Sequence, residues 1–164
     1  MIQKAVHQFA IQVETVNTSS LEMFISYNTK RVSSLVMNAV ETRLQKFGLH
    51  GPIDFSVLNL VNFNPGITSS QLCHALSIYP PNMVAIVRCL EVHNFLTKRK
   101  HLTDRRAQGL YLTQRGSELH AESQQVVADA DADLTGVLTT AERLLLNSLL
   151  RRIYVHCPES SGGD

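Results

Sequence analysis

The residues with the clearest chemical potential in this 164-residue sequence are basic, and they gather in the middle of the chain. The segment from Gly66 to Arg115 holds seven Lys and Arg residues and two acidic residues, a net charge of +5. The rest of the chain holds eight basic and twelve acidic residues, a net charge of −4, so the overall +1 hides a polarised molecule. A positive lobe of this kind attracts a phosphate backbone and releases its counterions, which predicts a nucleic-acid partner.

Side chains that can read base edges or hold phosphates lie along this segment. The amide of Asn82 can bond adenine, Arg88 can bond guanine or a phosphate, and Ala85 can touch a thymine methyl group. Thr68 and Ser70 are candidates for phosphate contacts, together with the backbone N–H groups at the start of a helix. Five further basic residues are expected to approach a narrow minor groove, where negative potential is concentrated: Lys98, Arg99, Lys100, Arg105 and Arg106. The alternative is that the basic run is a solvated hairpin.

The other chemistry-bearing residues form no catalytic, cofactor or metal motif. The sequence has no G-x-S-x-G, no P-loop and no G-x-G-x-x-G. Its seven histidines show neither H-x3-H nor HExxH spacing, which argues against a zinc site. We therefore expect no enzyme, no cofactor and no bound metal.

The cysteines leave one alternative open. They are three in number, far apart and without a CxxC pair, so reduced thiols are expected. Oxidation of Cys89 or Cys73 would add polarity to packed helices, so thiol-redox sensing through either residue is one possible function. The competing interpretation is that both are small buried hydrophobic residues.

Helical spacing and capping residues outline the elements that must position these side chains. Apolar residues from Leu21 to Phe47 recur at helical intervals, which predicts one long helix, or a helix with a break near Asn28, ending at Gly48. A short second helix opens at Pro52.

A helix-turn-helix and two strands are predicted next. Thr68 and Gln71 form a capping box, so a third helix begins there and ends near Leu76. A fourth helix begins at Pro80, and its outward face carries the three base-reading candidates. Its buried stripe comprises Met83, Ile86, Val87 and Leu90. Residues 95–100 and 110–112 are expected to form two short strands around a basic turn, and Asn94 is expected to close the helix before them.

Two helices complete the chain, one capped by Thr113 and one opened by a capping box of Thr139 and Glu142. Their apolar stripes, with that of the first helix, exceed what a small winged-helix core can cover. A two-fold homodimer with interlocking chain ends would cover them, and the alternative is a helical bundle within a monomer.

The wing sequence resembles that of MarR-type transcriptional regulators. The wing signature of these regulators is D-x-R-x5-L-T-x2-G. Here it is matched by Asp104-Arg105-Arg106, then Leu112-Thr113 after five residues, then Gly116 after two more. The likeness extends over roughly residues 35–153. It implies a mainly α fold with a small β-hairpin wing (α+β), a winged helix-turn-helix with N- and C-terminal dimerisation helices. It also implies a homodimeric repressor of palindromic double-stranded DNA, with recognition helices in successive major grooves and wings in minor grooves. Asp104 would hold Arg106 or stabilise the wing turn.

The resemblance further implies release from DNA by a small aromatic, anionic effector. Its pocket would lie where the dimer helices meet the winged-helix lobe, and an aromatic carboxylate would need a cation there. The candidates are Arg31, Arg43 and His50, with Tyr27 and Phe55 as aromatic walls. The alternative is that these five are surface charges and core aromatics.

These inferences divide the chain into five segments. Residues 1–20 are an N-terminal extension without an assigned structure, 21–50 and 114–156 are dimerisation helices, 51–113 are the winged helix-turn-helix, and 157–164 are a disordered tail. The absence of a long apolar run predicts no membrane span and a cytoplasmic protein. A winged helix used for dimerisation or protein docking without DNA binding is the alternative function.

Overall fold

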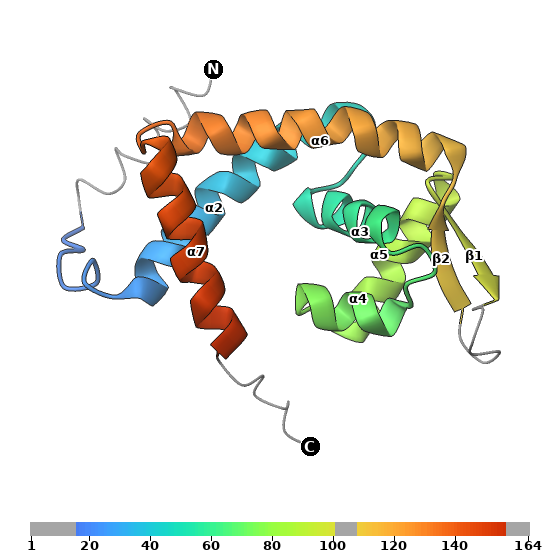
Figure 1. Ribbon diagram of the computed structural model, residues 1–164, viewed down its shortest axis with the longest axis horizontal. Helices are drawn as coiled ribbons and strands as arrows, with labels where there is room; N and C mark the ends of the chain where they lie inside the picture. Colours follow the sequence, from blue (N-terminus) through green and yellow to red (C-terminus); the bar gives the residue numbers. More distant parts are fainter. Residues whose placement is uncertain (1–15, 101–107, 157–164) are drawn as a thin grey trace.

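The computed structural model describes residues 16–100 and 108–156, and it is mostly helical with one two-stranded antiparallel sheet (Figure 1). The elements in chain order are α2 (Ile25–Leu44), the 3-10 helix η1 (Gln45–Phe47), α3 (Pro52–Phe63), α4 (Ser69–Leu76), α5 (Pro80–Val92), β1 (Leu96–Lys100), β2 (Gln108–Leu112), α6 (Gln114–Thr135) and α7 (Thr140–His156). The expected winged helix-turn-helix between terminal helices is therefore confirmed.

The first helix begins later than the apolar spacing predicts. Helix α2 starts at Ile25 rather than Leu21, because the Asn28 side chain donates hydrogen bonds to the carbonyl oxygens of Glu22 (2.7 Å) and Phe24 (3.2 Å). These bonds stabilise turns in the preceding residues that compete with a further helical turn. The far end follows the prediction, since η1 ends at Gly48 in the left-handed conformation, with φ of 74°.

The helix-turn-helix forms where the capping residues predict it. The Thr68 hydroxyl accepts from the Gln71 N–H at 3.3 Å, and the Gln71 side chain accepts from the Thr68 N–H at 2.9 Å. Left-handed Ser77 (φ 51°) ends α4, and Pro80 occupies the first turn of α5. Asn94 (φ 58°) turns the chain into β1, as the sequence predicts.

The wing is tied to the helix-turn-helix by a third segment of backbone. Strands β1 and β2 pair from Leu96 opposite Leu112 to Lys100 opposite Gln108. The Gly66 N–H donates to the Leu110 carbonyl oxygen at 2.8 Å, and the Leu110 N–H donates to the Ile67 carbonyl oxygen at 2.9 Å.

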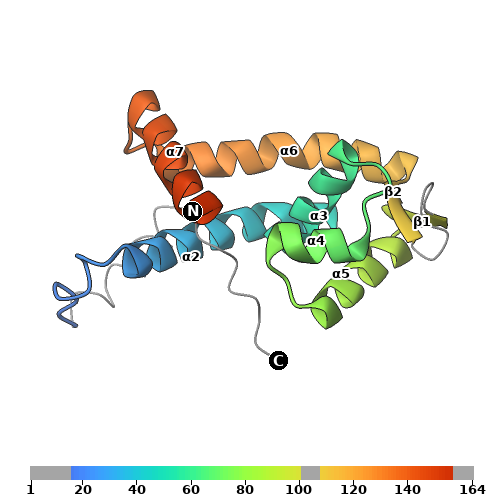
Figure 2. The same cartoon turned by 60° about the horizontal axis from the view of Figure 1, so that its bottom comes forward.

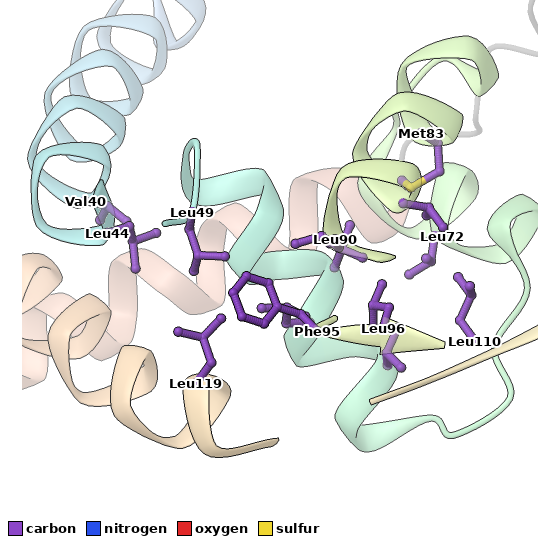
Figure 3. Packing of buried hydrophobic residues seen from close by; sticks show 14 of the residues in the cluster. Val40, Leu44, Leu49, Leu72, Met83, Leu90, Phe95, Leu96, Leu110 and Leu119 are labelled. Atoms are coloured by element: carbon purple, nitrogen blue, oxygen red, sulfur yellow. The ribbon is translucent and has the colours of Figure 1, made fainter. Parts of the chain in front are cut away.

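One hydrophobic core joins the winged-helix lobe to the long helices (Figure 3). Leu44 of α2 and Leu119 of α6 point toward Phe95 at the entry to β1, while Leu72 of α4 and Leu110 of β2 lie on the other side of the core. These side chains are at most 7% exposed. Burying such residues typically contributes about 1.5–3 kcal/mol each, so this packing fixes α5 and the wing relative to α6.

The terminal helices extend away from this lobe. Helix α6 runs the length of the molecule, α2 packs along it, and α7 projects from its far end (Figures 1 and 2). Helix α7 has no buried residue. None of the helices in the two described segments combines the length and the apolar character that a membrane crossing requires.

Candidate nucleic-acid interface

The outer face of α5 presents the three predicted base-reading residues to solvent. Asn82, Ala85 and Arg88 are exposed, whereas Met83 and Leu90 on the opposite face are fully buried. No hydrogen bond or ion pair joins the side chain of Asn82 or Arg88 to another residue of the described segments. Both groups are therefore available to an external partner.

Two of these residues, Ala85 and Arg88, line a shallow surface depression. It has a volume of about 450 Å³ and is lined by Pro81, Val84, Ala85, Arg88, Cys89, Val92 and His93. All seven residues belong to α5 or directly follow it. The outer face of α5 therefore holds a depression along one helix, with a single Arg in it.

The start of α4 offers one hydroxyl without a hydrogen-bond partner among the described residues and one that is already occupied. Thr68 donates to the Gln71 Oε1 at 3.1 Å while it caps the helix, so its hydroxyl serves the fold. Ser70, in the first turn of α4, is exposed. Of the two predicted phosphate contacts, Ser70 has the freer geometry.

The basic residues of β1 point in different directions. Lys98 Nζ forms an ion pair with Glu91 Oε2 of α5 at 2.6 Å. Arg99 lies on the other face of the hairpin, its guanidinium 5.1 Å from the ring centroid of Tyr111. Lys100, at the end of the strand, is exposed. The predicted wing-tip residues Asp104, Arg105 and Arg106 lie outside the described residues.

A thiol and imidazole cluster, which the sequence analysis did not foresee, lies at the C-terminal end of α5. Cys89 Sγ is 3.6 Å from His50 Nδ1 and 3.7 Å from His93 Nδ1. His50 Nδ1 in turn lies 3.4 Å from a carboxylate oxygen of Asp54, which is 6% exposed. The i, i+4 spacing of Cys89 and His93 was readable from the sequence. The approach of His50, 39 residues earlier, depends on tertiary packing.

The surroundings of Cys89 favour the thiol over the thiolate. Burial raises the pKa of the Cys89 thiol, and the nearby Asp54 carboxylate raises it further. Since the thiolate is the nucleophile, a raised pKa slows reaction with oxidants at neutral pH. Within residues 16–100 and 108–156, no group of three or more His, Cys, Asp and Glu side chains has a geometry suited to a metal ion.

The five predicted effector residues are spread over several environments. Arg43 forms an ion pair with Asp133 across α2 and α6, beside a groove lined by Thr42, Arg43, Lys46, Val126, Asp129 and Asp133. His50 belongs to the thiol cluster, and Phe55 stacks on His120. Tyr27 and Arg31 lie near the start of α2. One chain thus does not gather the five residues into one cavity.

A buried histidine between α3 and α6 was also absent from the sequence predictions. His120 is 4% exposed, and its Nε2 lies 2.9 Å from the Asn59 Oδ1. Its ring stacks on Phe55 at 5.9 Å between centroids and meets the edge of Phe63 at 6.3 Å. Burial lowers the pKa of His120, so the neutral imidazole is favoured.

Comparison with known proteins gives this arrangement a family context. The MarR family profile matches residues 52–107, from the start of α3 into the wing. A Thauera aromatica protein assigned to regulation of the hcr operon is 32% identical over 100 residues, which are 61% of this chain and 60% of the relative. The Mycobacterium tuberculosis transcriptional repressor Rv2887 is 26% identical over 129 residues, 79% of this chain and 92% of the relative.

Solved structures extend the likeness over the whole fold. The transcriptional repressor CouR bound to a 23-mer DNA duplex has a TM-score of 0.77 and 29% identity, covering 85% of this chain and 98% of CouR. Rv2887 in complex with salicylic acid has a TM-score of 0.66 and 25% identity, covering 79% and 96%. MarR from E. coli, at 20% identity and a TM-score of 0.70, has the same fold.

The match of the family profile to the helix-turn-helix and wing agrees with the capped helices and paired strands described above. The curated relatives and the superposable repressors extend that agreement to the terminal helices. Residues 52–107 thus match the MarR family, and the described residues share the fold of the superposable MarR-type repressors.

Proposed function

We propose that the protein is a homodimeric transcriptional repressor that binds palindromic double-stranded DNA in the cytoplasm and has no enzymatic role. The observation that carries this proposal is the outward face of α5, where Asn82 and Arg88 are exposed and unpaired within the described residues. Beside it run the basic residues of β1. The relatives described as transcriptional regulators support the same function.

In this proposal α5 enters the major groove and the β1–β2 wing approaches the adjacent minor groove. Arg88 would bond guanine or a phosphate, and Asn82 would bond adenine. The helix-turn-helix unit comprises residues 51–113. Two such units in a two-fold dimer would bind half-sites about one DNA turn apart.

The terminal helices, residues 21–50 and 114–156, would form the dimer interface. Large apolar side chains of α7 are left exposed by the rest of the described residues, among them Leu144, Leu145, Leu149, Ile153 and Tyr154. Exposed Ile25 and Val32 give α2 the same character. Apolar surface of this extent marks a protein interface, and a second copy of the chain presents the same surface to be covered.

Release by a small aromatic carboxylate is the regulatory part of the proposal. Solved relatives were captured with salicylic acid, p-aminosalicylic acid and p-coumaroyl-CoA. Release by an effector can be tested by calorimetry with aromatic carboxylates and their CoA thioesters. A gel shift with and without each ligand then measures its effect on DNA binding. Arg43→Ala is the first variant to examine, because Arg43 lies at the groove between α2 and α6.

The central test is a gel shift with duplex DNA from upstream of the protein's own gene. We expect a discrete complex whose affinity falls steeply with salt. The logarithm of the binding constant should fall against the logarithm of the salt concentration with a slope of about 0.9 for each phosphate contact. A protein that binds neither this DNA nor any duplex selected from a random pool would instead favour a winged helix used for protein docking.

A further inference from the structure

The outer face of α5 carries more apolar than polar surface. Val84 is 62% exposed and Val92 is 76% exposed, and both line the depression that contains Arg88. Pro81 and Ala85 add to the same surface. Single exposed valines are ordinary, but four small apolar residues lining one depression indicate a surface that contacts an apolar partner group.

The charge around this depression favours duplex DNA as that partner. Its lining includes Arg88 and no acidic residue. The nearby carboxylate of Glu91 is neutralised by Lys98. In the major groove the apolar group that distinguishes one base from the others is the C5 methyl of thymine.

Position along the helix separates two parts of the depression. Val84 lies four residues before Arg88, and Ala85 three residues before it, so all three share one helix face. Val92 lies eight residues after Val84, about 12 Å further along the axis. The first turns of a recognition helix are the part that contacts base edges, so Val84 and Ala85 are the better placed pair.

We propose that Val84, supported by Ala85, reads thymine methyl groups next to the base or phosphate that Arg88 contacts. The inference rests on the proposed DNA-binding function and deepens it, because it names a specificity-determining residue and the base that it selects. Operators of this protein should therefore carry a thymine at a fixed position in each half-site.

Uracil substitution tests the methyl contact directly. Binding sites are selected from a random duplex pool, and each thymine of the selected site is replaced singly by deoxyuridine, which lacks the methyl group and keeps the same hydrogen-bonding edge. For the wild-type protein we expect one thymine per half-site at which uracil lowers affinity about fourfold, the effect of losing one buried methyl-sized group. In Val84→Ala the same replacement should have no effect.

Val92→Ala is the matched control, because it makes the same substitution on the same helix at another exposed valine. Val92→Ala should retain the fourfold loss on uracil replacement. Arg88→Ala should weaken binding equally to the duplex with thymine and to the duplex with uracil. Unchanged melting temperatures would exclude misfolding of these exposed variants. If the selected DNA binds equally well with uracil at every position, the methyl contact is wrong while the DNA-binding function stands. If no DNA can be selected, the proposed function fails and this inference with it.

Discussion

At Gly116 the fold has no room for a side chain. A Cβ there would lie 2.0 Å from the carbonyl oxygen of Phe95, and the Gly116 N–H donates to the capping Thr113 hydroxyl at 3.0 Å. Gly116→Ala should therefore destabilise the protein by about 1–3 kcal/mol through overpacking, although alanine is the better helix former. Urea denaturation measures the change.

A second glycine serves as the control for that substitution. Gly136, which follows α6, has helical φ and ψ angles, and a Cβ there would make only ordinary contacts, 3.4 Å or more. Gly136→Ala should be neutral or stabilising. A Gly116→Ala protein as stable as the wild type would contradict the close approach of α6 to the wing.

His120 links stability to pH. Burial lowers its pKa in the folded state, so between that pKa and about 6.5 the unfolded chain binds more protons. This contribution to stability is present above the unfolded pKa and is lost as the pH falls from about 6.5 through the folded pKa. We expect the unfolding free energy to fall between pH 7.5 and pH 5.5.

The His120→Gln variant identifies this histidine as the source. Glutamine retains a side-chain N–H that can donate to the Asn59 Oδ1 but does not titrate in this range. Urea unfolding at the two pH values should therefore show a smaller loss for His120→Gln than for the wild type. An equal loss in both proteins would assign the pH dependence to other groups.

At the scale of the element, local sequence rules predicted most boundaries. The capping pairs Thr68–Gln71 and Thr139–Glu142 form as expected, because each depends on residues three apart. The start of α2 was missed because the Asn28 amide bonds carbonyls outside the helix. Apolar periodicity carries no information about that competition.

The candidate site was predictable to the extent that it lies on one helix. The outward positions of Asn82 and Arg88 follow from the 3.6-residue period of α5. The contact between His50 and Cys89 and the ion pair between Lys98 and Glu91 each join different elements. Their formation depends on how α5 lies against His50, in the segment before α3, and against β1, which the periodicity of one helix does not specify.

The Glu91–Lys98 pair holds a cation between the recognition helix and the wing. Glu91→Gln should free Lys98 and remove a negative charge near the phosphates, so DNA affinity at low salt should rise. The log–log salt slope should become steeper by about 0.9 if Lys98 then contacts one phosphate. Fluorescence anisotropy over a salt series measures both. Glu122→Gln makes the same charge change on α6 and should leave the DNA affinity and the salt slope unaltered. An equal gain in affinity in both variants would indicate a general charge effect.

At the scale of the molecule, charge is divided along the length of the chain. The basic segment from Gly66 to Arg115 lies in the winged-helix lobe, and the more acidic remainder includes the terminal helices. Helix α6 crosses both regions and packs against α2 and α3 (Figure 2). In the proposed dimer, a change in the packing of the terminal helices would alter the separation of the two α5 helices. The proposed effector would then have a mechanical route to DNA affinity.

The proposed dimerisation through α7 leads to the last prediction. Leu145, Leu149 and Ile153 recur at intervals of four residues and are 59%, 43% and 47% exposed. In a dimer that covers this stripe, Leu149→Glu would place an unpaired carboxylate in an apolar interface, a strongly destabilising change. Sedimentation should show the wild type at twice the 18.3 kDa chain mass and the variant at the single-chain mass.

Loss of the dimer should also remove most of the DNA affinity. A dimer binds its second half-site intramolecularly, and this avidity is worth about 100-fold to 10,000-fold. Leu149→Glu should therefore weaken operator binding by at least about 100-fold while its monomer retains the α5 reading face. Asn147→Glu adds the same charge to α7 at an exposed position off the stripe, so it should remain dimeric and bind normally. A Leu149→Glu protein that stays dimeric would place the interface elsewhere, and a monomer with full affinity would contradict the cooperation of two half-sites.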